Sequence, residues 1–330
     1  MPRTGLLLWP ICTGAIVLVL LFVARASAFL HHQCHRRRLS RQCAALRART
    51  PKMSSEIDET STIQRQKLFL PFPPSVRPTS LVFSDAQHKV WTFEQPFITT
   101  TNIKTRMSVF KCETSIVMYS PIAATPECCD MVRNIVGGMP TYIIMQSNAI
   151  DHTIFLNGWR RAVPSAQILN ISPREGDLPM LKDSSSGGET AIILPLPFQR
   201  GNQPIVEAAL LDIEPFFREI VLFHKPSKTL LCADAIWRVV SPTFSPNIVA
   251  ATGWKLFGVS GVSRFPYWFY FPRRKRAQVQ QFVDQVQAWG EIERCLPGHL
   301  DAIPAAAVGE EQTAEEVKRI FLQSFDFILR

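Results

Sequence analysis

The chain has 330 residues, of which 46% are apolar and 19% charged, a composition typical of a globular protein with a substantial core. Its net charge of +9 belongs entirely to the N-terminus, because nine basic residues precede the first acidic residue, Glu56, and the rest of the chain sums to zero. The folded body therefore has no charge excess that would bind nucleic acid, and we expect no nucleic-acid partner.

The first 55 residues have the features of a two-part targeting sequence. Arg3 precedes an uncharged apolar run at residues 5–24, and the small residues of "ASA" then supply the pattern that signal peptidase cleaves. The segment that follows is rich in arginine and has no acid, as transit peptides do. We expect a signal peptide at 1–28 and a transit-peptide-like segment at 29–55. If the apolar run is not removed, it forms a membrane anchor instead.

The stretch "ASAF", which ends at Phe29, resembles the cleavage site in the presequences of algae with secondary, red-lineage plastids. This resemblance implies a plastid location, with Phe29 at the start of the transit peptide. Five cysteines lie outside the presequence, an odd number with no C-x-x-C spacing. That pattern fits a reducing compartment and argues against a disulfide framework or a cysteine zinc site.

The rest of the chain is predicted to form one domain after a short extension. Residues 56–105 are predicted to be that extension, because the prolines of "FLPFPPSVRP" exclude helix and central strand. Regular structure is predicted for 106–330. The expected elements are a hairpin of strands at 107–110 and 115–119, a helix at 126–138, a strand at 141–146, a strand after Pro164, paired strands at 219–223 and 229–233, a helix at 274–289, a short strand and loop at 295–303, and a helix at 313–329. This order favours a layered, mixed α/β domain.

Side chains that can bind a metal follow three of the predicted strands. Asp151 and His152 follow the strand at 141–146, Asp234 follows the strand at 229–233, and His299 follows the short strand that begins at 295. Groups that arrive from separate strand ends can converge on one ion, and imidazole with carboxylate suits zinc or iron. Taken singly, each of these residues is more often a cap or a turn residue than a metal ligand.

Taken together and in this order, the motifs resemble the metallo-β-lactamase superfamily, whose hallmark H-x-H-x-D-H follows a strand. The stretch "SNAIDH" matches it, with Ser147 and Ala149 in place of the first two histidines. "CADAIW" matches a later aspartate motif through Asp234, and "PGHLD" matches the last histidine motif through His299. The resemblance implies an αββα sandwich with the site at strand ends along one edge. The amino-acid sequence is most similar to a poorly characterised branch of the superfamily seen in photosynthetic organisms.

The same resemblance implies that one of the superfamily's two metal sites is lost. The first metal uses the two leading histidines and a middle histidine, where this chain has Ser147, Ala149 and, in the middle region, only Glu214. The ligands of the second metal remain, and they are Asp151, His152, Asp234 and His299. We therefore predict at most one zinc or iron ion, with Asp234 also a candidate general base.

Three functions are compatible with these residues. The first is a one-metal hydrolase that acts on a small molecule of unknown identity. The second is a non-catalytic binding or structural protein on the same fold, which needs no ion. The third is membrane association, through the uncleaved run at 5–24 or through the aromatic and basic block Arg264–Arg276. This block can contact anionic lipid, but a block of this kind more often forms a packed loop and a helix start.

Overall fold

The computed structural model describes residues 77–98, 102–113, 115–147, 149–170, 189–191, 198–200, 203–213, 217–244, 248–266 and 275–330. The predicted signal peptide, the transit segment, the apolar run at 5–24, Glu214 and most of the block 264–276 lie outside these residues. No helix in the part of the chain that the structure describes is long and apolar enough to cross a bilayer.

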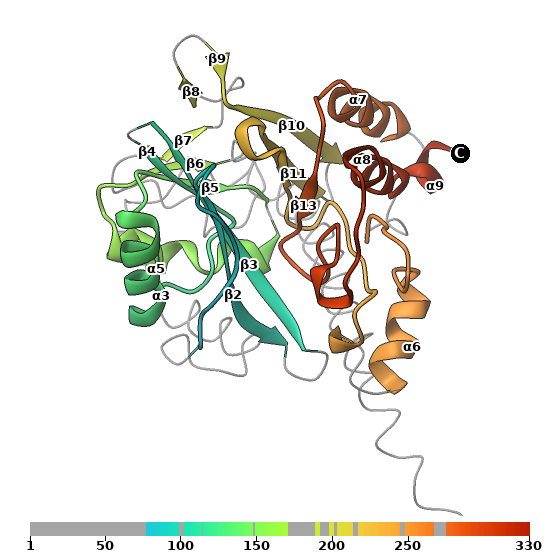
Figure 1. Ribbon diagram of the computed structural model, residues 1–330, viewed down its shortest axis with the longest axis horizontal. Coiled ribbons are helices and arrows are strands. Elements are labelled where there is room, and N and C mark those ends of the chain that lie inside the picture. The colour runs from blue at the N-terminus through green and yellow to red at the C-terminus, as the bar shows by residue number, and fades with distance from the viewer. Residues whose placement is uncertain are drawn as a thin grey trace, which may run out of the picture.

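Two β-sheets form the centre of the molecule (Figure 1). The larger sheet has seven strands in sequence order, antiparallel from the first to the fourth and parallel from the fourth to the seventh: β1 (Ser80–Asp85), β2 (Val90–Ile98), β3 (Ile103–Cys112), β4 (Ser115–Tyr119), β5 (Tyr142–Met145), β6 (Gln167–Asn170) and β7 (Glu189–Ala191). The smaller sheet has four: β10 (Val206–Ile213), β11 (Phe217–His224), β12 (Thr229–Leu231) and β13 (Arg294–Leu296). In it, β12 and β13 run parallel and the other neighbours antiparallel. A small separate pair joins β8 (Gln199–Arg200) to β9 (Gln203–Pro204).

Helices cover the outer face of each sheet. The helices are α3 (Pro126–Met131), continued by a π-helical segment at Val132–Gly137, then α4 (Ile150–Thr153), α5 (Leu156–Ala162), α6 (Ile248–Phe257), α7 (Arg276–Gln287), α8 (Ala314–Gln323) and α9 (Asp326–Leu329), with single 3₁₀ turns at Lys225–Ser227, Pro242–Phe244 and Ala306–Val308. In Figure 1, α3 and α5 lie beside the larger sheet and α7 and α8 beside the smaller one.

Three hydrophobic layers result from this arrangement. One lies between α3, α5 and the larger sheet and contains Trp159, and one lies between α7, α8 and the smaller sheet and contains Phe321. The third lies between the two sheets, where Ile144 of β5 packs with Leu222 of β11. The predicted αββα sandwich, two facing sheets between layers of helices, is confirmed.

The folded sheet begins earlier than the predicted domain boundary near Arg106. Strands β1 and β2 occupy part of the segment 56–105 that was expected to be an extension. The prediction extended the effect of the prolines in "FLPFPPSVRP" over the whole segment, but β1 begins at Ser80, after the last of them. Within β2, Pro96 lies beside an irregularity in the pairing with β3, where the chain tolerates a residue without an N–H. The strand β2 is therefore a central strand in spite of its proline.

Most of the predicted regular elements are present. The hairpin at 107–119 is confirmed as β3 and β4, and the paired strands around 224 are confirmed as β11 and β12. The terminal helix expected at 313–329 is interrupted at Ser324 and divides into α8 and α9. Ser324 donates a hydrogen bond to Ser263 Oγ at 2.8 Å, and its carbonyl accepts one from Phe265 N at 3.2 Å. These long-range contacts favour a break that helical periodicity does not reveal.

Candidate metal centre

Three of the predicted ligands come together at one edge of the sandwich. His152 lies on α4, directly after β5 of the larger sheet. Asp234 and His299 each lie three residues beyond paired strand ends, because Leu231 of β12 is opposite Leu296 of β13 in a parallel register. Equal offsets from paired residues on parallel strands bring the two side chains to the same place.

The three side chains form a compact and buried cluster. One potential ligand atom from each lies within 4.8 Å of the other two. His152 Nε2 is 3.5 Å from Asp234 Oδ2, and His299 Nε2 is 3.8 Å from Asp234 Oδ1. All three residues are at most 2% exposed. The carboxylate therefore presents one oxygen to each imidazole ring.

The outer nitrogens of both rings are held by the surrounding strands. His152 Nδ1 is 3.2 Å from Ser120 Oγ, just after β4, and His299 Nδ1 is 2.8 Å from the carbonyl of Lys104 in β3. Such contacts are typical of metal-binding histidines, because they fix the tautomer and direct the other nitrogen inwards. Among the described residues, none forms a hydrogen bond with the buried His152 Nε2. This orphaned nitrogen, together with the N,N,O donor set, fits a zinc or iron ion.

Gly298 allows the loop of His299 to approach His152 closely. A Cβ atom at this position would lie 3.0 Å from both His152 Cε1 and Ala233 Cα. The backbone of Gly298 also bridges two elements, since its N–H donates to Ala233 O and its carbonyl accepts from Arg106 N. Glycine at this position therefore brings the Asp234 and His299 loops together against the His152 ring.

The sequence analysis missed Glu219, which lies beside the cluster in β11. Its carboxylate accepts hydrogen bonds from Ala233 N at 2.6 Å and Asp234 N at 2.7 Å. Burial raises the pKa of Glu219 well above its usual range, as does the nearby charge of Asp234, while the backbone N–H groups act in the opposite direction. An acidic residue inside the fully buried strand "FREIVLFH" is the signal that would have indicated its role.

The remaining motif positions have different outcomes. The backbone of Asp151 belongs to α4, but its side chain lies outside what the structure describes. Ser147 forms a β-bridge with Glu219, and its Oγ accepts from Ala149 N at 3.1 Å. The carbonyl of Ala149 in turn accepts from His152 N. Ser147 and Ala149 therefore lie in a hydrogen-bonded segment that leads to His152.

Two buried cysteines near the cluster contact each other. Cys232 precedes Asp234 by two residues, and its sulfur lies 3.7 Å from that of Cys295. Burial, and then the contact with Cys295, raises the pKa of the Cys232 thiol well above its usual range. Among the described residues, the group that could hold a metal contains His152, Asp234 and His299 and neither of these thiols, so its ligand atoms are nitrogen and oxygen.

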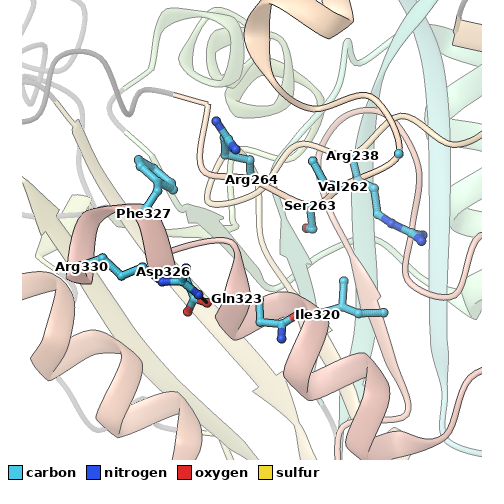
Figure 2. Close-up of a pocket in the computed structure, with 10 residues that line it drawn as sticks. Arg238, Val262, Ser263, Arg264, Ile320, Gln323, Asp326, Phe327 and Arg330 are labelled. Atoms are coloured by element: carbon cyan, nitrogen blue, oxygen red, sulfur yellow. Dashed lines mark hydrogen bonds and ion pairs between the residues drawn. The ribbon is translucent and has the colours of Figure 1, made fainter.

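A cavity of about 530 Å³ lies elsewhere, between the loop 261–264 and helices α8 and α9 (Figure 2). Its lining contains none of the predicted metal ligands. Several of its polar groups already pair with each other or with neighbours: Arg330 binds Asp326, and Arg238 forms a two-fold contact with Glu310. This cavity therefore offers no obvious recognition chemistry of its own.

A third buried histidine, His224, lies at the far end of β11. His224 Nδ1 is 2.8 Å from Ser227 Oγ, and both residues are almost fully buried. Burial lowers the pKa of His224 from 6.5 to about 4. The ring is therefore neutral at pH 7, and its pairing with Ser227 supports the turn between β11 and β12.

This shift predicts that His224 makes the protein sensitive to acid. Between pH 6.5 and pH 4 the unfolded chain binds a proton at His224 and the folded chain does not. The free energy of unfolding then falls by about 1.4 kcal/mol per pH unit, or about 3 kcal/mol across the window. Urea unfolding at pH 7 and pH 4.5 measures the effect. In His224→Gln the loss between the two pH values is expected to be smaller, and an equal loss in both proteins would contradict the prediction.

Comparison with known proteins identifies a family and a set of similar folds. The family model of a domain of unknown function, DUF4336, matches residues 87–257. No curated protein matches the sequence. A metallo-β-lactamase from Pontibacter korlensis has a TM-score of 0.48 at 9% identity, with 76% of this chain and 99% of that chain covered.

Two further solved structures are similar at the same level. The mono-zinc form of the metallo-β-lactamase FIM-1 from Pseudomonas aeruginosa has a TM-score of 0.46 at 9% identity, with 77% of this chain and 97% of that chain covered. The metal-soaked Flv1 flavodiiron core from Synechocystis sp. PCC6803 has a TM-score of 0.48 at 11% identity, with 76% and 61% covered.

Proposed function

Since the chain belongs to the DUF4336 family, whose function is unknown, we propose a function from the residues of its own site. The protein is a one-metal hydrolase on a metallo-β-lactamase-like fold, and its ligands are His152, Asp234 and His299. One zinc or iron ion binds per chain. The substrate is a small molecule of unknown identity.

The observation that carries this proposal is the convergence of the three buried side chains. Two imidazoles and a carboxylate from separate strand ends lie within 4.8 Å of one another. The Nδ1 atom of each histidine is hydrogen bonded, in His152 to Ser120 and in His299 to the carbonyl of Lys104. A cluster of this kind, built on rigid strands and fixed by outer hydrogen bonds, is preorganised for a cation.

The residues of the site have separable roles in hydrolysis. A zinc ion held by these three protein ligands would lower the pKa of a water molecule to about 7 and so would supply a nucleophile at neutral pH. His152 and His299 bind through Nε2. Asp234 balances the charge of the ion. Trp237 orients the carboxylate of Asp234, because its Nε1–H donates a hydrogen bond to Oδ1 at 3.0 Å. The carboxylate of Asp234 is also the candidate general base.

Burial of the ligands favours a second candidate function. All three residues are at most 2% exposed, and closed sites typically hold ions that stabilise a fold. In that case the ion joins the loop after β5 of the larger sheet to the loops after β12 and β13 of the smaller sheet, and no reaction takes place. The metal content is the same for both functions, so activity distinguishes them.

The test combines metal content with hydrolysis. The purified chain, loaded with zinc or iron under anaerobic conditions, is expected to contain one ion and to hydrolyse at least one member of a panel of lactones, thioesters and phosphodiesters. His299→Ala should lose both the ion and the activity, whereas His224→Ala should keep both. A loaded chain that hydrolyses nothing supports the structural ion, and a chain that binds no ion contradicts both candidates.

The proposed location is the plastid. The apolar run at 5–24, the "ASAF" stretch and the acid-free segment that follows support import in two steps. Mass spectrometry of the native protein is expected to show that residues 1–28 are absent and that the mature N-terminus lies near Glu56. A native chain that keeps residues 5–24 and remains in the membrane fraction would indicate an anchor instead.

A further inference from the structure

Glu219 makes unusual contacts for a residue in the middle of a β-strand. It is fully buried, and each of its two carboxylate oxygens accepts a backbone N–H from the turn after β12. One of these N–H groups belongs to Asp234 itself. Hydrogen bonds from backbone N–H groups to a buried carboxylate are about twice as strong as those between neutral groups.

The backbone of β11 is itself fixed where Glu219 lies. Glu219 forms an antiparallel bridge with Ser147, and Ile220 N donates to Gln146 O at 2.7 Å. Both partners belong to the segment that leads from β5 to His152. A rigid link therefore runs from the His152 side of the cluster, through Glu219, to the backbone of Asp234.

We propose that Glu219 is the positioning residue of the metal centre: its carboxylate holds the turn at Ala233 and Asp234 so that the two oxygens of Asp234 face His152 and His299. This inference rests on the proposed metal site. Trp237 fixes the side chain of Asp234 through Oδ1, and Glu219 fixes the backbone from which that side chain extends. The two contacts together leave the ligand little freedom to rotate away from the cluster.

Glu219→Gln tests the proposal with almost no change in volume. Its amide oxygen can accept one of the two N–H groups, but its NH₂ group then faces the other donor. The turn is expected to shift, and the Kd for zinc to rise roughly 10- to 100-fold, as is usual when an outer partner of a metal ligand is lost. Glu219→Asp keeps both carboxyl oxygens on a shorter side chain, so its Kd should lie between those of the parent and Glu219→Gln.

The control is a variant that lowers stability without reaching the site. Phe321→Leu removes packing between α8 and the smaller sheet and leaves the cluster untouched. Zinc titration by calorimetry is carried out on the full chain and the three variants, with the stability of each metal-free protein measured in urea. A merely structural role predicts equal zinc affinity for Glu219→Gln and Phe321→Leu at equal stability.

The outcomes separate this inference from the proposed function. A rise in Kd in the order parent, Glu219→Asp, Glu219→Gln, with Phe321→Leu unchanged, is the expected result. If the parent binds zinc and the Kd of Glu219→Gln is within two-fold of the parent's Kd, the positioning role is wrong and the metal site stands. If Glu219→Gln does not fold, a parent-like Kd for Glu219→Asp overturns the positioning role. If the parent itself binds no zinc, the proposed function fails and this inference fails with it.

Discussion

Replacing Asp234 by asparagine is expected to abolish zinc binding at micromolar metal. Each oxygen of Asp234 faces one imidazole, so the carboxylate is common to both halves of the site. Asparagine keeps the shape but removes the charge and turns one oxygen into an NH₂ group, which cannot bind a cation. The loss of affinity should exceed the roughly 100-fold that follows loss of an outer partner.

The measurement is calorimetric titration of the metal-free chain with zinc. Asp284→Asn is the matched control, because Asp284 lies on the surface of α7 and binds only Gln280 at 2.8 Å among its described contacts. This control should bind zinc as the parent does. Zinc binding by Asp234→Asn with parental affinity would mean that the ion, if bound, lies elsewhere.

Removal of the metal is expected to destabilise the whole sandwich. The three ligands come from three chain segments, one after a strand of the larger sheet and two after strands of the smaller sheet. An ion that binds all three in the folded state and none in the unfolded state adds about 2.7 kcal/mol to the free energy of unfolding when free metal is 100 times Kd. Chelation removes this contribution.

Urea unfolding of the full chain with zinc and with a chelator measures this difference. The midpoint should be lower with the chelator in the parent and unchanged in His299→Ala, which lacks a ligand. The same shift in His299→Ala would show that the chelator acts on something other than the cluster. Equal midpoints for the parent under both conditions would contradict a metal that joins the sheets.

The layers of the fold could be predicted because hydrophobic pattern and turn residues agree in most of the elements. The helix opened by Pro126 and the hairpin of β3 and β4 are examples in which local sequence and final structure coincide. The strands β1 and β2 were missed because the prolines of "FLPFPPSVRP" were taken to describe the whole segment 56–105, whereas β1 begins at Ser80, after the last of them. The break at Ser324 depends on contacts with Ser263 and Phe265, which are distant in sequence.

The candidate site could be predicted in part for a related reason. Each of the three candidate ligands, His152, Asp234 and His299, follows a strand in a motif with recognisable neighbours. The resemblance to a known superfamily then predicted that they share one metal site. Glu219 has no such motif, and its importance appears only when β11 is placed against the turn after β12. The contacts of Ser120 with His152 and of the Lys104 carbonyl with His299 could not be predicted either. They depend on how β4 and β3 are placed against the two histidines.

The most direct test of a single metal at the strand ends is anomalous scattering from crystals of the zinc-loaded chain, recorded at the zinc absorption edge. We expect one peak per chain, in contact with His152 Nε2, the carboxylate of Asp234 and His299 Nε2. No peak at this position, or two adjacent peaks with a second ion near Ser147, would contradict a one-metal site.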